Sequence, residues 1–358
     1  MNKHFLLFTI LVFFTGLYLG TLRIDIPEFE KQLHIPLELS VLLPLVFFGF
    51  IKGSCNYIAG RLSDKLGRKK LLIIGWIVAI FSIPLLFLPN IYTIIIISIL
   101  LAINQALTWT TTVTSQIDIS GKLRAGLATG INEMSGYLGV SIGSLLASYI
   151  FKISFVILLI TSILAVILSY TVMETKTLIR ENNENIKIKW IPITKISIAG
   201  LLEKFVDSSF FILIPTYLLL QHYSLTLVGL IVSSYAFVWS FSQPLFGYLA
   251  DLYSRKFILV IGFILMFLGF IHYSSYPMLF SVIEGIGMGM IYPNLIAAVN
   301  DIINEKVRGK ALGYYRLYRD SGYGIAGIVI PLLYILLGFN KTLLVIGILQ
   351  LLSLILIL

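Results

Sequence analysis

Twelve long apolar runs, separated by short polar breaks, repeat along the whole chain. Each run is close to the ~20 apolar residues that an α-helix needs to cross the hydrocarbon of a bilayer. Their spacing predicts an all-α membrane protein with twelve transmembrane helices. In the first half we expect these helices at residues 5–22, 39–59, 71–89, 91–115, 126–150 and 153–173. In the second half we expect them at residues 196–220, 225–249, 257–275, 278–300, 311–337 and 342–358.

The composition agrees with this pattern. Of the 358 residues, 58% are hydrophobic and only 12% are charged, whereas roughly 25% are charged in an ordinary soluble domain. The single cysteine, Cys55, excludes an internal disulfide. The four histidines are scattered one at a time without the spacing of metal ligands, so we predict no metal site and no cofactor.

The net charge of +9 is distributed unevenly over the predicted loops. With the N-terminus inside the cell, 18 of the 26 Lys and Arg residues fall in cytoplasmic segments and four fall outside. The positive-inside rule then predicts a multi-pass protein of the plasma membrane with both termini in the cytoplasm. The basic charge is therefore an orientation signal with a mild attraction for anionic lipid, and we expect no nucleic-acid partner.

The second half of the chain repeats motifs of the first half. The sequence at residues 60–64 recurs in related form at residues 247–251, and a basic pair follows each copy. Two parallel six-helix repeats are typical of transporters whose halves rock against each other. We therefore predict two pseudo-symmetric six-helix halves at 1–173 and 196–358, joined by a central cytoplasmic loop at 174–195.

The segment GRLSDKLGRKK at residues 60–70 resembles the loop between helices 2 and 3 of the major facilitator superfamily. The aspartate of such a loop can accept hydrogen bonds from the N-terminus of a neighbouring helix and pair with the following arginine. Its glycines permit a tight turn and close helix contact. We predict a charged gating latch; the alternative is a basic loop that only anchors the orientation. The predicted latch residues are Gly60, Asp64, Gly67, Arg68, Asp251 and Arg255.

Two further segments match the superfamily in part. Gly130, Gly139 and Gly143 have the spacing of the helix 5 motif of proton-driven drug antiporters, although Ser144 replaces the expected proline. Small residues at this spacing also serve as a plain packing face. Residues 313–327 look like the helix 11 region of facilitators, whereas the arginine motif expected in helix 4 is absent.

Nine ionisable side chains lie within the predicted spans, five of them acidic and four basic. A charge at the bilayer centre costs about 2.5 to 3.5 kcal/mol, so each should face a partner or a wet cavity. If each base pairs with one acid, one carboxylate is left without a partner. Binding a proton neutralises this carboxylate, which costs less than burying it charged. The alternative is a fully satisfied ion-pair network that only holds the helices in register. The proton-coupling candidates are Glu203, Asp207, Glu133 and Glu284, and we favour Asp207 or Glu203.

Helical spacing predicts the arrangement of these charges. Arg316 and Asp320 are four residues apart, so we expect them to pair within one helix and to leave Arg319 for another helix or a ligand. Glu203 and Asp207 should likewise share one helix face, with Lys204 beside them. The residues predicted to form ion pairs or to contact the substrate are Arg23, Lys52, Lys204, Arg316, Arg319 and Asp320.

In the superfamily, helices 1, 4, 7 and 10 line a central cavity. The resemblance therefore implies a set of cavity-lining residues on three of these helices. They are Asn104, Gln105, Trp109, Phe211, Tyr292 and Asn294.

The function predicted from these features is secondary active transport of a small organic solute by alternating access. We expect coupling to protons, as in drug or metabolite efflux antiporters, so that the proton gradient supplies the energy. One alternative is a proton-coupled uptake permease for a small organic anion. An alternative of another class is a membrane sensor or scaffold without transport. The predicted spans contain no recognisable catalytic nucleophile and no pair of metal ligands, so we do not expect an enzyme. The expected partners are a small-molecule substrate and the bilayer, and we expect a monomer.

Overall fold

The computed structural model describes residues 2–34, 46–178 and 188–358, and within these ranges the regular structure is entirely helical. The helices of the first half are α1 (Lys3–Gln32), α3 (Phe48–Leu66), α4 (Arg68–Ser82), α5 (Ile91–Ser120), α6 (Ala125–Tyr149) and α7 (Phe151–Thr171). Those of the second half are α8 (Trp190–Asp207), α9 (Ser209–Ile212), α10 (Ile214–Leu220), α11 (Leu225–Leu252), α12 (Arg255–His272), α13 (Pro277–Asp301), α14 (Arg308–Leu337) and α15 (Phe339–Ile357).

Every predicted span coincides with a helix or a set of consecutive helices, so the all-α membrane fold is confirmed. Residues 39–45 of the second predicted span lie outside the described ranges. Eight of the described helical segments are individually long and apolar enough to cross a bilayer.

Several helices continue past the ends predicted from the apolar runs. We expected the first helix to end at residue 22, but α1 continues to Gln32; α5 likewise continues to Ser120. The backbone hydrogen bonds of a helix do not stop where the apolar residues stop. The change from apolar to polar residues marks the edge of the bilayer, and the helix ends lie beyond it.

The seventh span was predicted as one helix over 196–220, and this is wrong in detail because the chain forms α8, α9 and α10 there. The first break follows Asp207, and the second precedes Pro215, which lies in the first turn of α10, where its missing backbone donor costs no helical hydrogen bond. Backbone hydrogen bonds still cross the breaks, for example from the Ser208 amide to the Lys204 carbonyl at 3.1 Å. The span is an interrupted helix, a form that membrane proteins use near binding sites.

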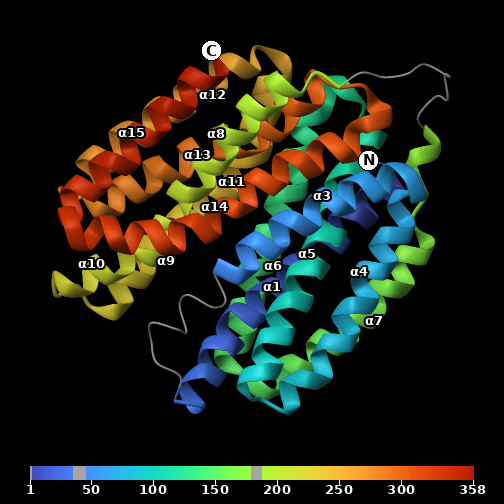
Figure 1. Cartoon of the computed structure of the whole chain (residues 1–358), viewed down its shortest axis with the longest axis horizontal. Helices are drawn as coiled ribbons and strands as arrows, with labels where there is room; N and C mark the ends of the chain where they lie inside the picture. Colours follow the sequence, from blue (N-terminus) through green and yellow to red (C-terminus); the bar gives the residue numbers. More distant parts are fainter. Residues whose placement is uncertain (1, 35–45, 179–187) are drawn as a thin grey trace.

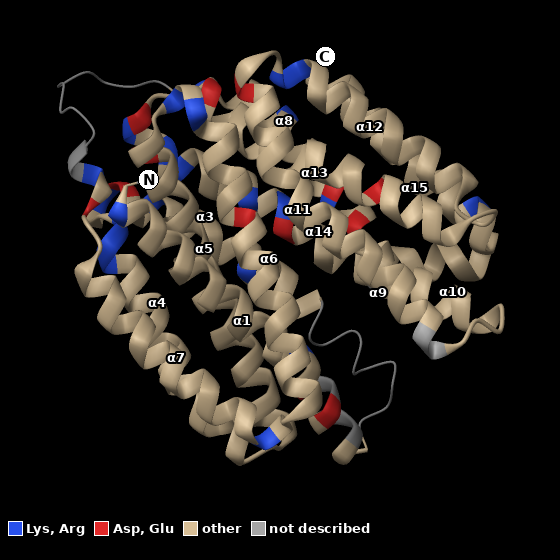
Figure 2. Ribbon diagram, turned by 180° about the vertical axis from the view of Figure 1, so that it is seen from behind, with Lys and Arg blue, Asp and Glu red and all other residues tan. Residues whose placement is uncertain are grey.

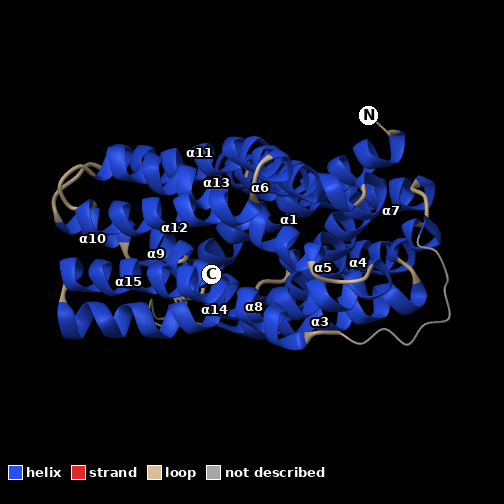
Figure 3. Ribbon diagram, turned by 90° about the horizontal axis from the view of Figure 1, so that it is seen from above, coloured by secondary structure: helices blue, strands red, loops and turns tan. Residues whose placement is uncertain are grey.

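The helices form two bundles with the two halves of the chain on either side (Figures 1 and 3). One buried apolar cluster is formed by first-half residues alone. The other is formed mainly by second-half residues, with a few first-half side chains at the contact between the bundles. The bundles meet along two helix pairs, α3 with α14 and α6 with α11.

Glycines permit the close approach of these helices. A Cβ on Gly60 of α3 would lie 2.0 Å from the carbonyl oxygen of Gly309 on α14. A Cβ on Gly247 of α11 would lie 2.2 Å from the carbonyl oxygen of Gly126 on α6. Real side chains do not fit at such distances, so both contacts between the bundles depend on glycine.

The two termini lie at the same end of the molecule (Figure 1). Many of the charged residues gather at this end, and a second group lies at mid-height between the bundles (Figure 2). We refer to the end with the termini as the terminal end. These two charged groups contain the candidate site.

Candidate functional site

The predicted latch joins the two bundles at the terminal end. Asp64, near the end of α3, accepts hydrogen bonds from the backbone amides of Gly309 at 3.0 Å and Lys310 at 2.7 Å. These amides belong to the first turn of α14, where backbone donors have no partner within the helix. Arg68 pairs with the same carboxylate at 2.9 Å. The carboxylate thus caps a helix of the opposite half.

The second copy of the motif repeats this geometry in the reverse direction. Asp251 of α11 accepts hydrogen bonds from the amides of Gly126 at 2.9 Å and Leu127 at 2.8 Å, in the first turn of α6. Arg255 pairs with Asp251 at 2.9 Å and with Asp301 at 2.6 Å. Each half therefore caps one helix of the other, as the sequence repeat predicts for a symmetric device.

A buried ion pair connects the first latch to the neighbouring helices. Arg68 also contacts Asp118 of α5 at 3.2 Å, and Asp118 pairs in turn with Arg308 at the start of α14. Both arginines are almost fully buried. Asp118 thus links cations from both halves, and separating the bundles at this end requires this link to break.

Glu174 belongs to the latch, although the sequence analysis did not single it out. Its carboxylate accepts hydrogen bonds from the amides of Arg68 at 2.9 Å and Lys69 at 3.1 Å, at the start of α4. Gly67, with φ of +100°, makes the turn there, and a Cβ on it would lie 2.2 Å from Glu174 Oε2. Glu174 is the first residue after the sixth apolar run. It belongs to no motif, so nothing in the local sequence indicates its role.

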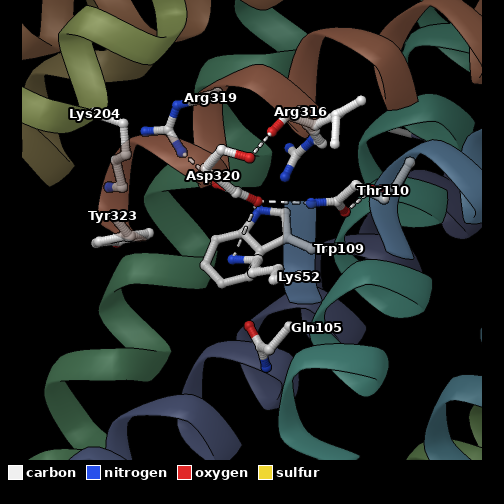
Figure 4. Close-up of polar contacts among 12 residues, drawn as sticks. Lys52, Gln105, Trp109, Thr110, Lys204, Arg316, Arg319, Asp320 and Tyr323 are labelled. Carbon is white, nitrogen blue, oxygen red and sulfur yellow. Dashed lines mark hydrogen bonds and ion pairs between the residues drawn. The ribbon is translucent and has the colours of Figure 1, made fainter. Parts of the chain in front are cut away.

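Charged side chains at mid-height form pairs between the bundles (Figure 4). Arg316 of α14 lies 2.7 Å from Glu133 of α6. Lys52 of α3 lies 3.7 Å from Asp320 of α14. All of these side chains are buried, so their mutual pairing offsets the cost of desolvation.

Two further pairs lie within the second half. Arg319 of α14 binds Glu203 of α8 through two nitrogens, at 2.8 and 3.1 Å. Lys204 pairs with Asp207 at 2.5 Å, one turn along α8. The side chain of Arg23 on α1 donates to the Tyr323 hydroxyl at 3.2 Å and so approaches the same region.

The predicted pairing of Arg316 with Asp320 within one helix is wrong. Arg316 pairs instead with Glu133. Asp320 forms ion pairs with Lys52 and, at 3.3 Å, with Arg319. It also accepts a hydrogen bond from Asn56 at 2.7 Å. A pair of opposite charges on different helices can approach head-on. This geometry replaces the weaker contact along one helix.

The charge count predicted one carboxylate without a base, but Asp207 and Glu203 are not that carboxylate because each is paired with a cation. Among the five acids counted in the predicted spans, it is Glu284 of α13. Its side chain is fully buried, and neither oxygen has a hydrogen-bond partner in the described part of the chain. The carboxyl lies against Gly269 of α12, where a Cβ would approach its Oε1 to 2.2 Å. Glu284 is therefore a buried acid that needs a proton, and Asp25 of α1, which lies beyond the predicted first span, is a second one with both oxygens unpartnered in the described ranges.

Aromatic rings surround the cations of this region. The ammonium of Lys204 lies 4.3 Å from the ring centre of Tyr323, 5.4 Å from that of Trp239 and 6.0 Å from that of Tyr137. The Arg319 guanidinium lies 3.6 Å from the centre of Tyr292. These contacts are within the range of cation–π attraction.

Only some of the predicted cavity-lining residues belong to the central charged network. Trp109 donates to Glu133 at 2.9 Å, and Tyr292 stacks under Arg319, so both belong to the central network. Gln105 donates to the Thr15 carbonyl at 2.9 Å, while its own carbonyl oxygen is buried and has no partner in the described ranges. The side chain of Phe211 lies outside the described set.

Two of these residues have other positions than predicted. Asn104 donates to the Gly75 carbonyl at 2.9 Å and so faces α4. Asn294 accepts from Arg255 at 3.0 Å, which places it in the second latch. Proximity along a helix does not determine which face points to the cavity. Among the described residues there is no cluster of three possible metal ligands.

A two-bundle helical membrane protein with a latch at one end and buried charges between its halves has the features of a transporter. Comparison with known proteins defines the class more closely: the profile of the Major Facilitator Superfamily matches residues 8–224 and 196–358. The chain belongs to this superfamily, whose members are transporters and not enzymes.

Three relatives illustrate the similarity. Multidrug resistance protein 1 of Bacillus subtilis (strain 168) is 32% identical over 124 residues, which is 32% of this chain and 31% of that protein. The human organic anion transporter MFSD10 (TETRAN) has a TM-score of 0.87 at 13% identity, with full coverage of both chains. The proton:xylose symporter XylE has a TM-score of 0.80 at 14% identity, over 99% of this chain and 95% of that one. The two structural similarities concern the fold.

Proposed function

We propose that this protein is a secondary active transporter that moves a small organic solute by alternating access in exchange for protons. The observation that carries the proposal is the set of buried ion pairs between the halves, Glu133 with Arg316 and Lys52 with Asp320. A purely structural core would be equally stable with apolar residues at these positions. Ion pairs between two bundles can instead open when a charged ligand or a proton replaces one partner.

Glu284 supports the coupling to protons. A fully buried carboxylate without a basic partner is most stable when protonated. The phenolic groups of Tyr235 and Tyr273 lie in its surroundings, and the Tyr235 hydroxyl donates to Asp207 at 2.5 Å. A proton bound at Glu284 is thus close to the charged network that joins the halves.

Efflux is the direction that we favour. The excess of buried acids over bases suits a neutral or cationic solute, and the relative from Bacillus subtilis is named for multidrug resistance. Uptake of a small organic anion is the second candidate, because Arg23, Lys204, Arg316 and Arg319 would attract one. A sensor without transport would have no need for the two intact latches.

The orientation and the assembly state belong to the same proposal. The excess of Lys and Arg at the terminal end favours a cytoplasmic location of both termini in the plasma membrane. We propose that a monomer is the transporting unit, since each latch and each buried pair closes within one chain. The proton gradient is the proposed source of energy, with no other cofactor.

A solute screen in proteoliposomes tests the proposal. The protein is reconstituted with a pH dye inside the vesicles, a pH gradient is imposed, and candidate solutes are added one at a time. We expect one class of solute to cause proton movement that protein-free vesicles lack. Solute movement that ignores the pH gradient, or no movement for any class, would contradict the proposal.

A further inference from the structure

Lys204 occupies a site with the chemistry of a receptor for organic cations. Its ammonium is fully buried and faces the rings of Tyr137, Trp239 and Tyr323, which come from α6, α11 and α14. Figure 4 shows Lys204 beside Tyr323. Proteins recognise quaternary ammonium ligands with such groups of aromatic faces. Here a side chain of the protein itself supplies the cation.

A carboxylate completes this aromatic cage. Asp207 lies 2.5 Å from the Lys204 ammonium and receives a second hydrogen bond at 2.5 Å from the Tyr235 hydroxyl. This second bond holds the carboxylate in place if the lysine moves away. A carboxylate fixed at the edge of an aromatic cage is the counter-ion that a bound amine requires.

Unused polar atoms next to the cage indicate that something else binds there. The indole N–H of Trp239 is buried and has no hydrogen-bond partner in the described ranges. Gln243, one turn further along α11, is fully buried, and both polar atoms of its amide are likewise unpartnered among the described residues. Buried polar groups are normally satisfied, so a donor and an amide left open on one helix face suit a polar ligand.

We propose that the solute is an organic cation and that it replaces the ammonium of Lys204 in this cage. This inference rests on the proposed transport function and names its substrate class. The substrate ammonium takes the position against Asp207 and the three rings, while Lys204 releases one proton to the water that enters with the substrate and withdraws as a neutral amine. One positive charge enters and one proton leaves, so the exchange is electroneutral.

An arriving organic cation changes the balance of charge around Lys204. Two cations cannot share one carboxylate in a buried site without strong repulsion, so an arriving cation favours the neutral form of the lysine. Arg319, which also faces the site, adds to this repulsion and cannot give up its own proton. The charged and titratable groups around Lys204 come from five helices. They are Glu203 and Asp207 of α8, Tyr137 of α6, Lys52 of α3, Tyr235 of α11, which binds Asp207, and Arg319, Asp320 and Tyr323 of α14. Arg23 of α1 binds the hydroxyl of the same Tyr323.

The first test measures binding by the wild-type protein in detergent. Choline, tetraethylammonium and benzyltrimethylammonium are permanent cations, and 3,3-dimethylbutanol is the neutral analogue of choline. We expect at least one of the cations to bind and to release about one proton per bound cation, as a pH dye in weak buffer reports. The neutral analogue should release none. Cation binding without proton release, or tight binding of the neutral analogue alone, would overturn the proposal.

Substitutions at Lys204 give opposite expected results. Lys204→Met vacates the cage, so the same cations should bind about tenfold more tightly or better, because the internal competitor is gone. Their binding should release no proton, and their transport should follow membrane potential instead of the pH gradient. Lys204→Arg retains a cation that cannot lose its proton, so binding should be lost. Lys195→Met, on the exposed part of the same helix, is the matched control and should behave as wild type.

The outcomes also separate this inference from the proposed function. If Lys204→Met binds no cation although it elutes as a folded monomer, or if Lys204→Arg transports cations normally, the inference is wrong. Proton-driven movement of an anion or a neutral solute by the wild-type protein would preserve the proposed function and overturn only the cation site. If Lys204→Met does not fold, the proton release measured when cations bind the wild-type protein still tests the inference.

Discussion

The carboxylate of Glu133 on α6 lies 2.7 Å from the guanidinium of Arg316 on α14, although 183 positions separate them in the chain. The pair joins the two bundles at mid-height, away from the latches at the terminal end. Trp109 donates a further hydrogen bond to the same carboxylate at 2.9 Å. The two halves are therefore held together at two levels.

Glu133→Gln should destabilise the protein because it leaves the buried Arg316 without its counter-charge. Breaking a buried pair from one side costs about 3 to 5 kcal/mol, which thermal unfolding in detergent will show as a clear fall in the midpoint. The double variant Glu133→Gln with Arg316→Met removes both charges and should recover most of the loss. Equal midpoints for the single variant and the wild type would show that the pair is not formed in solution.

Gly60→Ala should weaken the contact of α3 with α14. Its methyl group would lie 2.0 Å from the Gly309 carbonyl oxygen, so the helices must separate and the latch must open. We expect a large loss of transport and a lower unfolding midpoint. Gly229→Ala in α11 is the matched control, since no atom lies within 4 Å of its Cβ position. At that position alanine should be neutral or stabilising by up to about 1 kcal/mol, and equal losses in both variants would argue against the close contact.

Asp64→Asn should disturb the first latch without removing any bulk. Asparagine keeps one acceptor oxygen, so one of the backbone amides of Gly309 and Lys310 faces an NH2 group that cannot accept its hydrogen bond. A hydrogen bond to a charged group contributes about 1.5 to 3 kcal/mol, so the closed form should lose at least about tenfold in population. Asp251→Asn should have a similar effect through α6, and the exposed Lys70→Gln should have none. The transport rate at a fixed pH gradient measures all three, and unchanged transport by both aspartate variants would refute the latch.

Glu284→Gln should keep the fold and weaken the dependence of transport on the pH gradient, without abolishing it while Lys204 is intact. The side chain has no basic partner in the described structure, so a neutral amide of the same shape fits in its place. Asp207→Asn is the comparison, because it leaves Lys204 unpaired and should lower the unfolding midpoint. Transport by Glu284→Gln that follows the imposed pH gradient as steeply as the wild type does would remove Glu284 from the coupling mechanism.

Much of the fold could be predicted from the sequence, because bilayer crossing imposes a length and an apolar composition on every helix. The latch could be predicted as well: Asp64 and Asp251 lie in repeated motifs at helix ends, where backbone donors are available. The break after Asp207 could not, because one polar residue in an apolar run is compatible with a continuous helix. Pro215 was the only local signal for an interruption.

Within the site, the sequence defined the set of charges and not their pairing. The excess of one acid followed from a count, whereas its assignment to Glu284 depends on which helices face each other. Spacing on one helix suggested Asp320 for Arg316, but packing of α6 against α14 supplied Glu133. Glu174 had no pattern at all, since its role arises only where a loop passes the start of α4.

The most direct test of alternating access is a pair of distances measured by spin labels in a Cys55→Ser background. One pair is exposed beside the second latch, with Leu123 just before α6 and Tyr253 just after α11. The other pair is exposed at the far ends of two helices, with Tyr149 at the end of α6 and Leu220 at the end of α10. We predict that transported solute or a change of pH moves the two distances in opposite directions, with one lengthening as the other shortens. Two distances that stay fixed, or that lengthen together, would contradict the account.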